Sequence, residues 1–275
     1  MKEFVNKLYC IDNLELLKQL PSNSIDLIYC DILYNTGKKF KDYDDNLGTP
    51  QEAIEWYKPR LIEMKRVLKD TGSIWIHCDS NLSHYLKVEM DNIFPIFINE
   101  IIWQYPKGIK NSTRKEINNH DTIFRYGKTN NYTHNVLEEP YTKDQLKRFK
   151  YEDEYGRFYW DTRRDKDNNK IRVKVYLKKN GTPLGDVWYF NFAQGNERVG
   201  YDTQKPIELL KRIILSSSNE NDIVADFFMG SGTTIVATKE LNRNYIGCDI
   251  NSKSIEITKK RLKILLTKDK NVDII

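Results

Sequence analysis

Two short segments of this 275-residue chain carry residues that could act together on a nucleoside and on a planar amine. The first, residues 225–249, runs through a glycine-rich turn at Gly230 and Gly232 and ends in Asp249. Glycine lets the backbone turn tightly and approach a ligand closely, and an acid about 20 residues later commonly holds a ribose in nucleotide-binding βαβ units. The spacing therefore predicts a pocket for a nucleoside cofactor.

The same turn lacks the features that hold phosphates. The third glycine of the dinucleotide fingerprint is absent, and no lysine follows the turn as a P-loop requires. S-adenosylmethionine has an adenine, a ribose and an amino-acid end but no pyrophosphate, so it is the cofactor that we expect. The alternative for each glycine is a simple turn or a helix cap. The agreement of strand, turn, helix and terminal acid favours the cofactor pocket.

The second segment, Asp31-Ile-Leu-Tyr34, joins an acid to an aromatic residue at the end of an apolar run. Open α/β sheets bind ligands at the carboxyl ends of their strands. An exocyclic base amine is a poor nucleophile, so its methylation needs acceptors for the N–H protons and a methyl donor held in line. Asp31 and the carbonyl of Ile32 can supply acceptors, and Tyr34 can stack on a flipped base. The alternative is an ordinary strand end capped by an aspartate.

Alternating strands and helices must position these residues. Apolar periodicity predicts helices at residues 13–20, 50–69, 82–93, 206–216, 233–242 and 252–267, with Asp70-Thr-Gly72 ending the second of them. Strands are predicted at 4–11, 25–30, 73–78, 97–105, 120–126, 222–228 and 244–249. Residues 171–177 alternate apolar and basic types before Asn180-Gly181, which predicts a hairpin with a tight turn. This order predicts an α/β fold with a mostly parallel sheet and helices on both of its faces.

Composition narrows the class of protein. Hydrophobic residues make up 39% of the chain and charged residues 30%, which is typical of a globular protein. The sequence has neither a run of about 18 apolar residues nor an apolar N-terminal segment, so we expect no membrane span and no secretory signal. Four scattered cysteines predict reduced thiols in a cytoplasmic protein. No metal is expected, because the sequence contains no tight group of cysteine and histidine ligands.

The middle of the chain is basic. Residues 101–200 contain 20 lysines and arginines against 13 acidic residues, whereas the net charge of the whole chain is only +5. From about residue 106 to residue 200 the hydrophobic periodicity fades, and asparagine, lysine, arginine and tyrosine dominate. A basic region on a nearly neutral body is what binding to a polyanion needs. The alternative is a set of solvated loops.

These motifs resemble those of the β-class S-adenosylmethionine-dependent DNA amino-methyltransferases. The resemblance rests on Asp31-Ile-Leu-Tyr34, on Tyr201-Asp-Thr-Gln-Lys-Pro206 and on Asp226-Phe-Phe-Met-Gly-Ser-Gly-Thr233, which follow the order of that class and span most of the chain. It implies a Rossmann-like methyltransferase fold with an inserted DNA-recognition region. Residues 1–105 would form its catalytic half, residues 106–200 the inserted region, and residues 201–275 the cofactor-binding half.

The resemblance also implies roles for single residues. Asp31 and Tyr34 would be catalytic and would bind the target base. The cofactor would be held by Asp12, Asp31, Thr203, Lys205, Phe228, Gly230, Gly232, Thr233 and Asp249. Within that set, Asp249 would bind the ribose and Asp12 the adenine amine. In the basic region, contacts with DNA are expected from Lys107, Lys110, Arg114, Arg163, Arg164 and Arg172.

The implied activity is site-specific transfer of a methyl group from S-adenosylmethionine to the N6 amine of adenine in DNA, because an aspartate heads the tetrapeptide. N4-cytosine methylation and a catalytically degenerate DNA-binding subunit stay open as alternatives. The class implies double-stranded DNA and a second copy of this chain, as a homodimer, for partners. It also implies a restriction–modification system that would contain a cognate restriction endonuclease or a second methyltransferase.

One departure from the class concerns the tetrapeptide itself. The usual sequence is Asp-Pro-Pro-Tyr, and this chain has Ile32 and Leu33 in place of the two prolines. Because proline fixes φ, its loss leaves the loop freer by about 0.4–1 kcal/mol per site in chain entropy. We expect reduced preorganisation of this loop rather than loss of activity.

Overall fold

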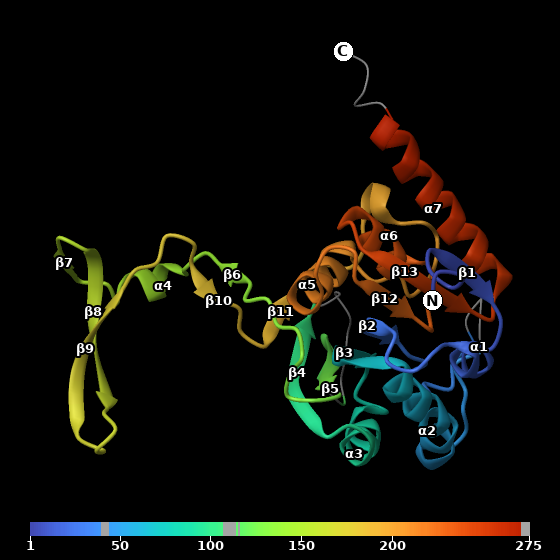
Figure 1. The fold of residues 1–275 in the computed structure, drawn as a ribbon, viewed down its shortest axis with the longest axis horizontal. Coiled ribbons are helices and arrows are strands. Elements are labelled where there is room, and N and C mark those ends of the chain that lie inside the picture. The colour runs from blue at the N-terminus through green and yellow to red at the C-terminus, as the bar shows by residue number, and fades with distance from the viewer. Residues whose placement is uncertain (40–43, 107–113, 115, 271–275) are drawn as a thin grey trace. The chain divides into compact units, whose positions relative to one another are not determined.

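An eight-stranded mixed sheet forms the centre of the larger of two compact units in this computed structural model (Figure 1). The structure describes residues 1–39, 44–106, 114 and 116–270. The larger unit comprises Met1–Asn135 and Asp186–Ile275, and the smaller unit comprises Val136–Gly185. The strands of the sheet are ordered β1 (Lys7–Cys10), β13 (Asn244–Asp249), β12 (Ile223–Asp226), β2 (Ile25–Asp31), β3 (Leu68–Cys78), β5 (His120–Gly127), β4 (Ile96–Gln104) and β11 (Val187–Tyr189).

Most of these strands are parallel, as the alternation of strands and helices predicted. The exception is β5, which runs antiparallel to both β3 and β4. The central strand β2 is buried over nearly its whole length, and the side chains of Ile25, Leu27 and Ile28 have no exposed surface. A strand covered on both faces needs a mainly apolar run rather than an alternating pattern. This is why the apolar residues before Asp31 form the middle of the sheet.

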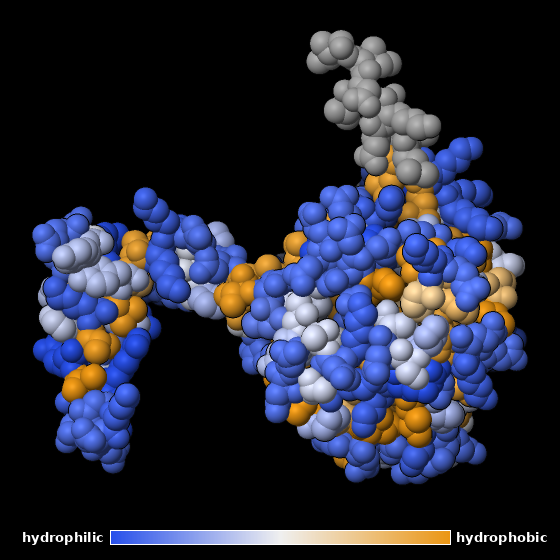
Figure 2. Space-filling model, in the orientation of Figure 1, coloured by the Kyte–Doolittle hydropathy of each residue, from blue (hydrophilic) through white to orange (hydrophobic). Residues whose placement is uncertain are grey.

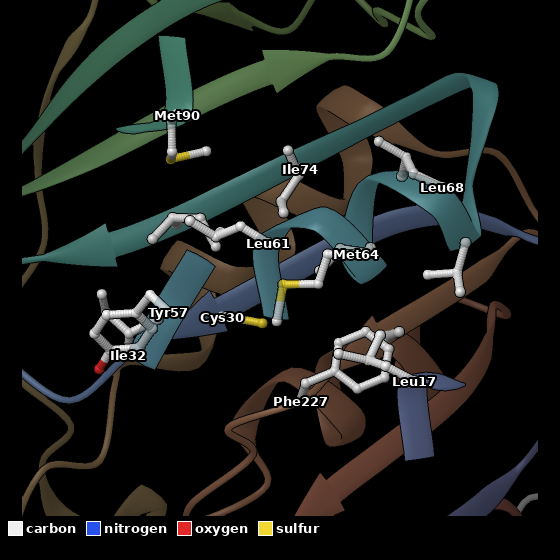
Figure 3. Close-up of a cluster of buried hydrophobic side chains, with 14 of the residues drawn as sticks. Leu17, Cys30, Ile32, Tyr57, Leu61, Met64, Leu68, Ile74, Met90 and Phe227 are labelled. Carbon is white, nitrogen blue, oxygen red and sulfur yellow. The ribbon is translucent and has the colours of Figure 1, made fainter. Parts of the chain in front are cut away.

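Helices cover both faces of the sheet. One face carries α1 (Asn13–Gln19), α2 (Pro50–Val67) and α3 (Ser83–Ile93), and the other carries α5 (Ile207–Ser217), α6 (Thr233–Glu240) and α7 (Ser252–Lys270) (Figure 1). On the first face, Leu61 and Met64 of α2 belong to the same buried cluster as Cys30 of β2 (Figure 3). On the second, Leu209 of α5 shares a cluster with Trp75 of β3. None of the helices in the described part of the chain has the length and apolar character needed to cross a membrane.

The element boundary that differs most from the prediction lies between α2 and β3. The helix α2 ends at Val67, where Leu68 adopts an extended backbone with φ −66° and ψ 135°, and β3 begins at once. Asp70-Thr-Gly72 therefore lies within β3 and does not end the helix. Gly72 suits this place because a Cβ atom there would approach the backbone oxygen of Asp26, on the neighbouring strand, to 2.9 Å.

The smaller unit consists of two small sheets and one short helix. Its elements are β6 (Glu138–Glu139), α4 (Lys143–Leu146), β7 (Tyr151–Asp153), β8 (Gly156–Arg164), β9 (Lys170–Tyr176) and β10 (Thr182–Pro183). The hairpin predicted at Asn180-Gly181 is wrong, because β9 pairs antiparallel with the preceding strand β8. That hairpin closes at residues 165–169, where Asp165 Oδ1 accepts backbone N–H bonds of 2.9 Å from Asp167 and Asn169. Asn180-Gly181 instead leads into β10, which pairs with the distant β6.

The inserted region expected at residues 106–200 is wider than the smaller unit. The strands β5 and β11 both belong to the central sheet, although both lie within that range. A short 3₁₀ helix, η1 (Gly195–Glu197), precedes α5 and also belongs to the larger unit. The compact part of the region is therefore Val136–Gly185.

Candidate active site

Three neighbouring parallel strands end in an acid at the same edge of the central sheet. β2 ends at Asp31, β12 at Asp226 and β13 at Asp249. A cavity of about 210 Å³ opens at this edge and is lined by all three acids. Open α/β sheets bind ligands at the carboxyl ends of their strands. The two segments that the sequence singled out thus meet in one cavity.

Nearly all the residues expected to hold the cofactor line this cavity. They are Asp12, Asp31, Thr203, Lys205, Phe228, Gly230, Thr233 and Asp249. Gly232 does not line it. Gly232 is the N-cap of α6 with φ of 74°, and a Cβ atom there would lie 2.1 Å from Oγ1 of Thr258 on α7. Backbone conformation and close packing of α6 against α7 therefore explain this glycine.

The glycine-rich turn orients the carboxylate of Asp249. The N–H of Gly230 donates to Asp249 Oδ2 at 2.8 Å, and the N–H of Asn251 donates to Oδ1 at 2.8 Å. Burial raises the pKa of Asp249, while these backbone donors favour its charged form. At Gly230 φ is 49°, and a Cβ atom would press on the ring of Tyr201 at 3.3 Å. The turn thus needs glycine where it faces the cavity.

Asp12 sits in a fixed setting at another part of the cavity wall. Its Oδ1 accepts the N–H of Leu14 at 2.9 Å, and its Oδ2 forms a 2.8 Å ion pair with Arg60. The guanidinium of Arg60 lies 3.4 Å from the ring of Trp56, which also lines the cavity. Trp56 was not among the predicted site residues, although it is an aromatic residue on the predicted helix 50–69. Its ring adds an apolar wall beside Asp12.

Asp31 and Tyr34 are joined directly. The hydroxyl of Tyr34 donates to Asp31 Oδ1 at 2.8 Å, and Lys205 Nζ lies 2.6 Å from Asp31 Oδ2. Burial and the nearby charge of Asp31 raise the pKa of Tyr34, so its hydroxyl stays protonated. Lys205 was expected among the residues that hold the cofactor. The structure places its ammonium group on the catalytic candidate Asp31.

A buried polar network that was not predicted from the sequence continues from the hydroxyl of Tyr34. Its hydroxyl also approaches Asp121 Oδ2 at 3.3 Å, and the same oxygen lies 3.3 Å from Nε2 of the fully buried His77. The other ring nitrogen, Nδ1, is 2.9 Å from the hydroxyl of Tyr29, and Tyr105 donates to Asp121 Oδ1 at 3.1 Å. Although burial opposes it, the hydrogen bond and charge of His77 hold the pKa of Asp121 below its usual value.

The signal for this network was present in the sequence but ambiguous. His77 and Asp121 each stand in a strand-like apolar run, where an isolated polar residue needs a buried partner. The two meet because β3 and β5 pair antiparallel, with His77 opposite Ile123. That pairing joins residues separated by 44 positions in the chain. Periodicity alone does not reveal such a pairing.

Three other groups hold the backbone of the tetrapeptide loop. The N–H of Ile32 donates to the backbone oxygen of His77 at 3.2 Å, and the hydroxyl of Tyr57 donates to the backbone oxygen of Leu33 at 2.9 Å. Just beyond Tyr34, the buried carboxylate of Asp45 accepts bonds from the N–H of Asn35 and from both the N–H and the hydroxyl of Thr36, at 2.6–3.1 Å. The loop is thus anchored without the two prolines.

The third acid at the sheet edge, Asp226, is fully buried. Burial raises the pKa of its carboxyl to about 7, although hydrogen bonds from Thr234 and from the N–H of Phe228 oppose this shift. A carboxyl with this pKa changes its charge near neutral pH. The charge of Asp226, which lines the cavity, therefore depends on pH near neutrality.

None of the candidates for DNA contacts that the structure describes lines this cavity. Lys107 and Lys110 lie outside the residues that the structure describes. Arg114 is exposed. Arg163, Arg164 and Arg172 are exposed on β8 and β9 of the smaller unit.

A family model described as DNA methylase, for N6 and N4 methyltransferases, matches residues 25–260 of the chain. Among curated relatives, the type II methyltransferase M.HpaI of Haemophilus parainfluenzae is 35% identical over 93% of this chain and 74% of its own length. The DNA adenine methyltransferase YhdJ of Escherichia coli (strain K12) is 32% identical over 92% of this chain and 81% of its own length. The sequence similarity thus extends across both halves of the larger unit.

Solved structures show the same fold at low identity. The PvuII DNA methyltransferase, described as cytosine-N4-specific, superposes with a TM-score of 0.67 at 15% identity, covering 93% of this chain and 85% of that one. The complex of M1.HpyAVI with S-adenosylmethionine gives a TM-score of 0.58 at 22% identity, covering 93% and 98%. These similarities confirm the predicted Rossmann-like methyltransferase architecture.

Proposed function

The chain belongs to the DNA methylase family of S-adenosylmethionine-dependent N6 and N4 methyltransferases, and we propose that it methylates the N6 amine of adenine in DNA. One observation carries the proposal. Asp31 and Tyr34, the pair suited to a base amine, line the same cavity as Gly230 and Asp249, the pair suited to a nucleoside cofactor. Methyl transfer requires donor and acceptor to be held in line within one site.

The residues around the cavity fit S-adenosylmethionine. Asp249 stands at the end of β13 with its carboxylate held by two backbone donors, which suits a ribose. Trp56 and Phe228 offer aromatic walls near Asp12, with their ring centroids 6.2 Å apart, which suits an adenine. Lys205 offers a cation for the carboxylate of the amino-acid end. When bound, this cofactor supplies an activated methyl group.

The chain's own residues would prepare the base. Asp31 accepts hydrogen bonds from Tyr34 on Oδ1 and from Lys205 on Oδ2, so its carboxylate is already held in a fixed orientation. A base amine that replaced one of these donors would place its N–H toward Asp31 Oδ1 or Oδ2. Accepting hydrogen bonds from the N–H groups, without removing a proton first, would favour a pyramidal nitrogen whose lone pair is turned out of the ring. One proton would then leave the nitrogen as it forms the new bond to the methyl group. Tyr34 would stack on the base and keep water from its face.

Adenine is the proposed target, and cytosine is the nearest alternative. The proposal for adenine rests on the aspartate that heads Asp31-Ile-Leu-Tyr34 and on the relative YhdJ, which is named a DNA adenine methyltransferase. The solved PvuII enzyme is named cytosine-N4-specific, but at 15% identity it supports the fold alone. Both bases present an exocyclic amine, so the same residues could serve either reaction.

The biological setting belongs to the same proposal. Several relatives are named type II methyltransferases, among them M.HpaI and M.HinfI of Haemophilus species. We therefore place the chain in a restriction–modification system in the cytoplasm, with duplex DNA as substrate, a homodimeric state, and a cognate endonuclease or second methyltransferase as partner. Residues 106–200 would recognise the DNA, with Val136–Gly185 as their compact part.

The deciding experiment is a transfer assay. Purified protein is incubated with unmethylated bacterial DNA and isotopically labelled S-adenosylmethionine, and labelled nucleosides are identified by mass spectrometry. Label in N6-methyladenine supports the proposal, and label in N4-methylcytosine keeps the site but changes the base. An absence of label, with the cofactor still bound in calorimetry, would indicate a degenerate subunit. The Asp31→Ala variant should bind the cofactor and transfer no label, so turnover in this variant would remove Asp31 from its catalytic role.

A further inference from the structure

The hairpin of β8 and β9 in the smaller unit has two chemically different faces. Directly opposite residues on paired strands project to the same side, and neighbours along a strand project to opposite sides. The register pairs Phe158 with Tyr176, Trp160 with Lys174, Thr162 with Arg172, and Arg164 with Lys170. We name as the basic face the side formed by Phe158, Trp160, Thr162, Arg164, Lys170, Arg172, Lys174 and Tyr176. The opposite face is formed by Arg157, Tyr159, Asp161, Arg163, Ile171, Val173 and Val175.

Contacts between side chains agree with this division. On the basic face, the guanidinium of Arg172 lies 5.0 Å from the ring of Trp160, and Lys174 Nζ lies 4.6 Å from the ring of Phe158. On the opposite face, Arg163 pairs with Asp161 at 3.0 Å. These contacts place Arg172 and Lys174 beside aromatic rings on the basic face, and Arg163 beside an acid of its own strand on the opposite face.

The two faces also differ in what covers them. On the opposite face, the ring of Phe149 packs edge-on against Tyr159 at 5.2 Å, and Arg157 donates to the backbone oxygen of Phe149 at 2.9 Å. Phe149 itself is buried, so the chain near α4 covers part of this face. On the basic face, Arg172 is exposed and Trp160 keeps 39% of its surface exposed. Figure 2 shows that most of the visible surface of the smaller unit is hydrophilic. The part of the basic face around Trp160 and Arg172 is thus open to a partner.

The charges of the basic face are arranged in a row and are largely unneutralised. Lys170, Arg172 and Lys174 occur at every second position of β9, which spaces them by about 6.8 Å and extends the row over about 14 Å. Within the described residues, Lys174 pairs with Asp153 of β7 at 2.6 Å, whereas no carboxylate pairs with Lys170, Arg172 or Arg164. A row of this length suits a polymer with repeated negative charges better than a single phosphate.

We propose that the basic face binds the phosphate backbone of the DNA substrate. This inference rests on the proposed function and names the surface that would contact the DNA. The ring of Trp160 supports the side chain of Arg172 and leaves its guanidinium N–H groups at the rim free to donate to phosphate oxygens. The hydroxyl of Thr162 lies opposite Arg172 and can donate to the same backbone. Arg163, paired with Asp161 on the opposite face, takes no part.

The test measures how DNA affinity depends on salt. The full-length protein is titrated by fluorescence anisotropy with a labelled, unmethylated duplex at several salt concentrations. Each lost phosphate contact lowers the slope of log affinity against log salt by about 1. Arg172→Ala should lower it by about 1, and Lys170→Ala combined with Arg172→Ala by about 2. Arg172→Lys keeps the charge and should keep the slope, which separates lost contact from a misfolded smaller unit.

The matched comparison is Arg163→Ala, which removes the same charge from the neighbouring strand on the opposite face. The proposal expects the wild-type slope for Arg163→Ala. It is overturned if Arg163→Ala and Arg172→Ala lower the slope equally, or if the double variant leaves it unchanged. Failure of the proposed function looks different. In that case the wild-type protein itself would bind no duplex and transfer no methyl group, whatever the variants do.

Discussion

At the scale of single residues, the reactivity of the site depends on how Asp31 and Tyr34 are held. Tyr34 shares its hydroxyl between Asp31 and Asp121, at 2.8 Å and 3.3 Å. Asp121 in turn contacts His77, whose other nitrogen reaches Tyr29. A side chain that is already hydrogen-bonded to a buried network loses little conformational freedom when the substrate binds. We therefore regard Asp121 as a positioning residue rather than a catalytic one.

Changing Asp121 to Asn should slow transfer without weakening cofactor binding. An unsatisfied or mispaired buried group costs about 1–3 kcal/mol, which corresponds to a factor of roughly 5–150 in rate if it acts in the transition state. Measuring kcat, KM for DNA and the affinity for S-adenosylmethionine separates these effects. A role through Tyr34 also predicts a displaced pH profile of kcat. A uniform loss of folded protein with an unchanged profile would reduce Asp121 to a structural residue.

The two positions that lack proline should respond differently when proline is restored. The N–H of Ile32 bonds to the backbone oxygen of His77 at 3.2 Å, whereas the N–H of Leu33 has no partner among the described residues. Ile32→Pro loses a bond worth about 0.5–1.5 kcal/mol, which offsets the entropy it saves. Leu33→Pro loses no hydrogen bond. It should speed single-turnover methylation by roughly 2–5-fold, because the entropy that it saves is worth about 0.4–1 kcal/mol. Equal rates in both variants and the wild type would refute the expected lack of preorganisation.

Asp226 predicts a pH dependence of stability. Burial raises the pKa of its carboxyl from 3.8 to about 7, so the native state binds this proton more tightly than the unfolded chain does. The resulting stabilisation is complete below pH 3.8 and is lost as the pH rises toward 7. Asp226→Asn cannot ionise, so its Tm relative to wild type should be higher at pH 8 than at pH 5. Each kcal/mol of difference corresponds to about 2–4 °C.

The two proteins in this comparison share every other titrating group, so the difference in Tm isolates Asp226. The Asn side chain can still accept the N–H of Phe228, which Asp226 accepts at 3.0 Å. A difference in Tm that stays constant between pH 5 and pH 8 would show that Asp226 is charged in the native state throughout this range.

At the scale of elements, the start of α6 is the most constrained part of the cofactor half. Gly232 caps this helix with φ of 74°, and the place of a Cβ atom is taken by Thr258 of α7. Gly232→Ala should therefore destabilise the protein by more than the roughly 1–2 kcal/mol expected for a left-handed backbone alone. Gly195, with φ of 56° and nothing within 4 Å of an added Cβ, provides the matched control.

Urea denaturation of both variants measures how much more Gly232→Ala lowers the free energy of unfolding than Gly195→Ala does. Gly195→Ala should show only the destabilisation caused by its left-handed backbone. Thr258→Ala introduced into Gly232→Ala should restore part of the lost stability, because it removes the clash with the added Cβ atom. Equal destabilisation of Gly232→Ala and Gly195→Ala would mean that α6 and α7 move apart at little cost. The packing explanation for Gly232 would then fail.

Elements with a strong local pattern were predictable, and those defined by distant pairing were not. The apolar run of β2 placed Asp31 at the end of its strand, and apolar periodicity placed the start of α5 within one residue of Ile207. Asn180-Gly181 is a strong local turn signal, yet β9 had a better partner in β8, with seven paired positions. His77 and Asp121 were missed for the same reason, since their meeting depends on the antiparallel pairing of β3 with β5.

At the scale of the whole molecule, the order of the motifs along the chain allowed the fold to be predicted, whereas composition gave only the approximate position of the inserted region. The motif order predicted the methyltransferase fold, and the residues of both halves meet in one cavity. Composition indicated a basic region in the middle of the chain. The predicted bounds of this region were set by the distribution of charge and do not coincide with those of the compact unit. Charge does not show that His120–Gly127 adds a strand to the central sheet, because a strand pairs through its backbone. Packing narrows the compact unit to Val136–Gly185.

This division predicts that the cofactor site does not need the smaller unit. Both junctions are tied to the larger unit. The N–H of Asn135 donates to the backbone oxygen of Ser216 at 2.9 Å, and the N–H of Ile102 donates to that of Asp186 at 2.8 Å. Every residue that lines the cavity also belongs to the larger unit. Replacing residues 136–185 by a flexible glycine–serine linker should therefore leave the affinity for S-adenosylmethionine within a few-fold of the wild-type value.

The same replacement should remove most of the affinity for DNA, because it deletes the basic face. Calorimetry with S-adenosylmethionine and anisotropy with a duplex measure the two effects on one preparation, and the cofactor measurement shows that the larger unit is folded. Full DNA affinity after the deletion would assign DNA binding to the larger unit. Loss of cofactor binding with an unfolded protein would show that the two units depend on each other for stability, because independent domains keep their own cores when separated.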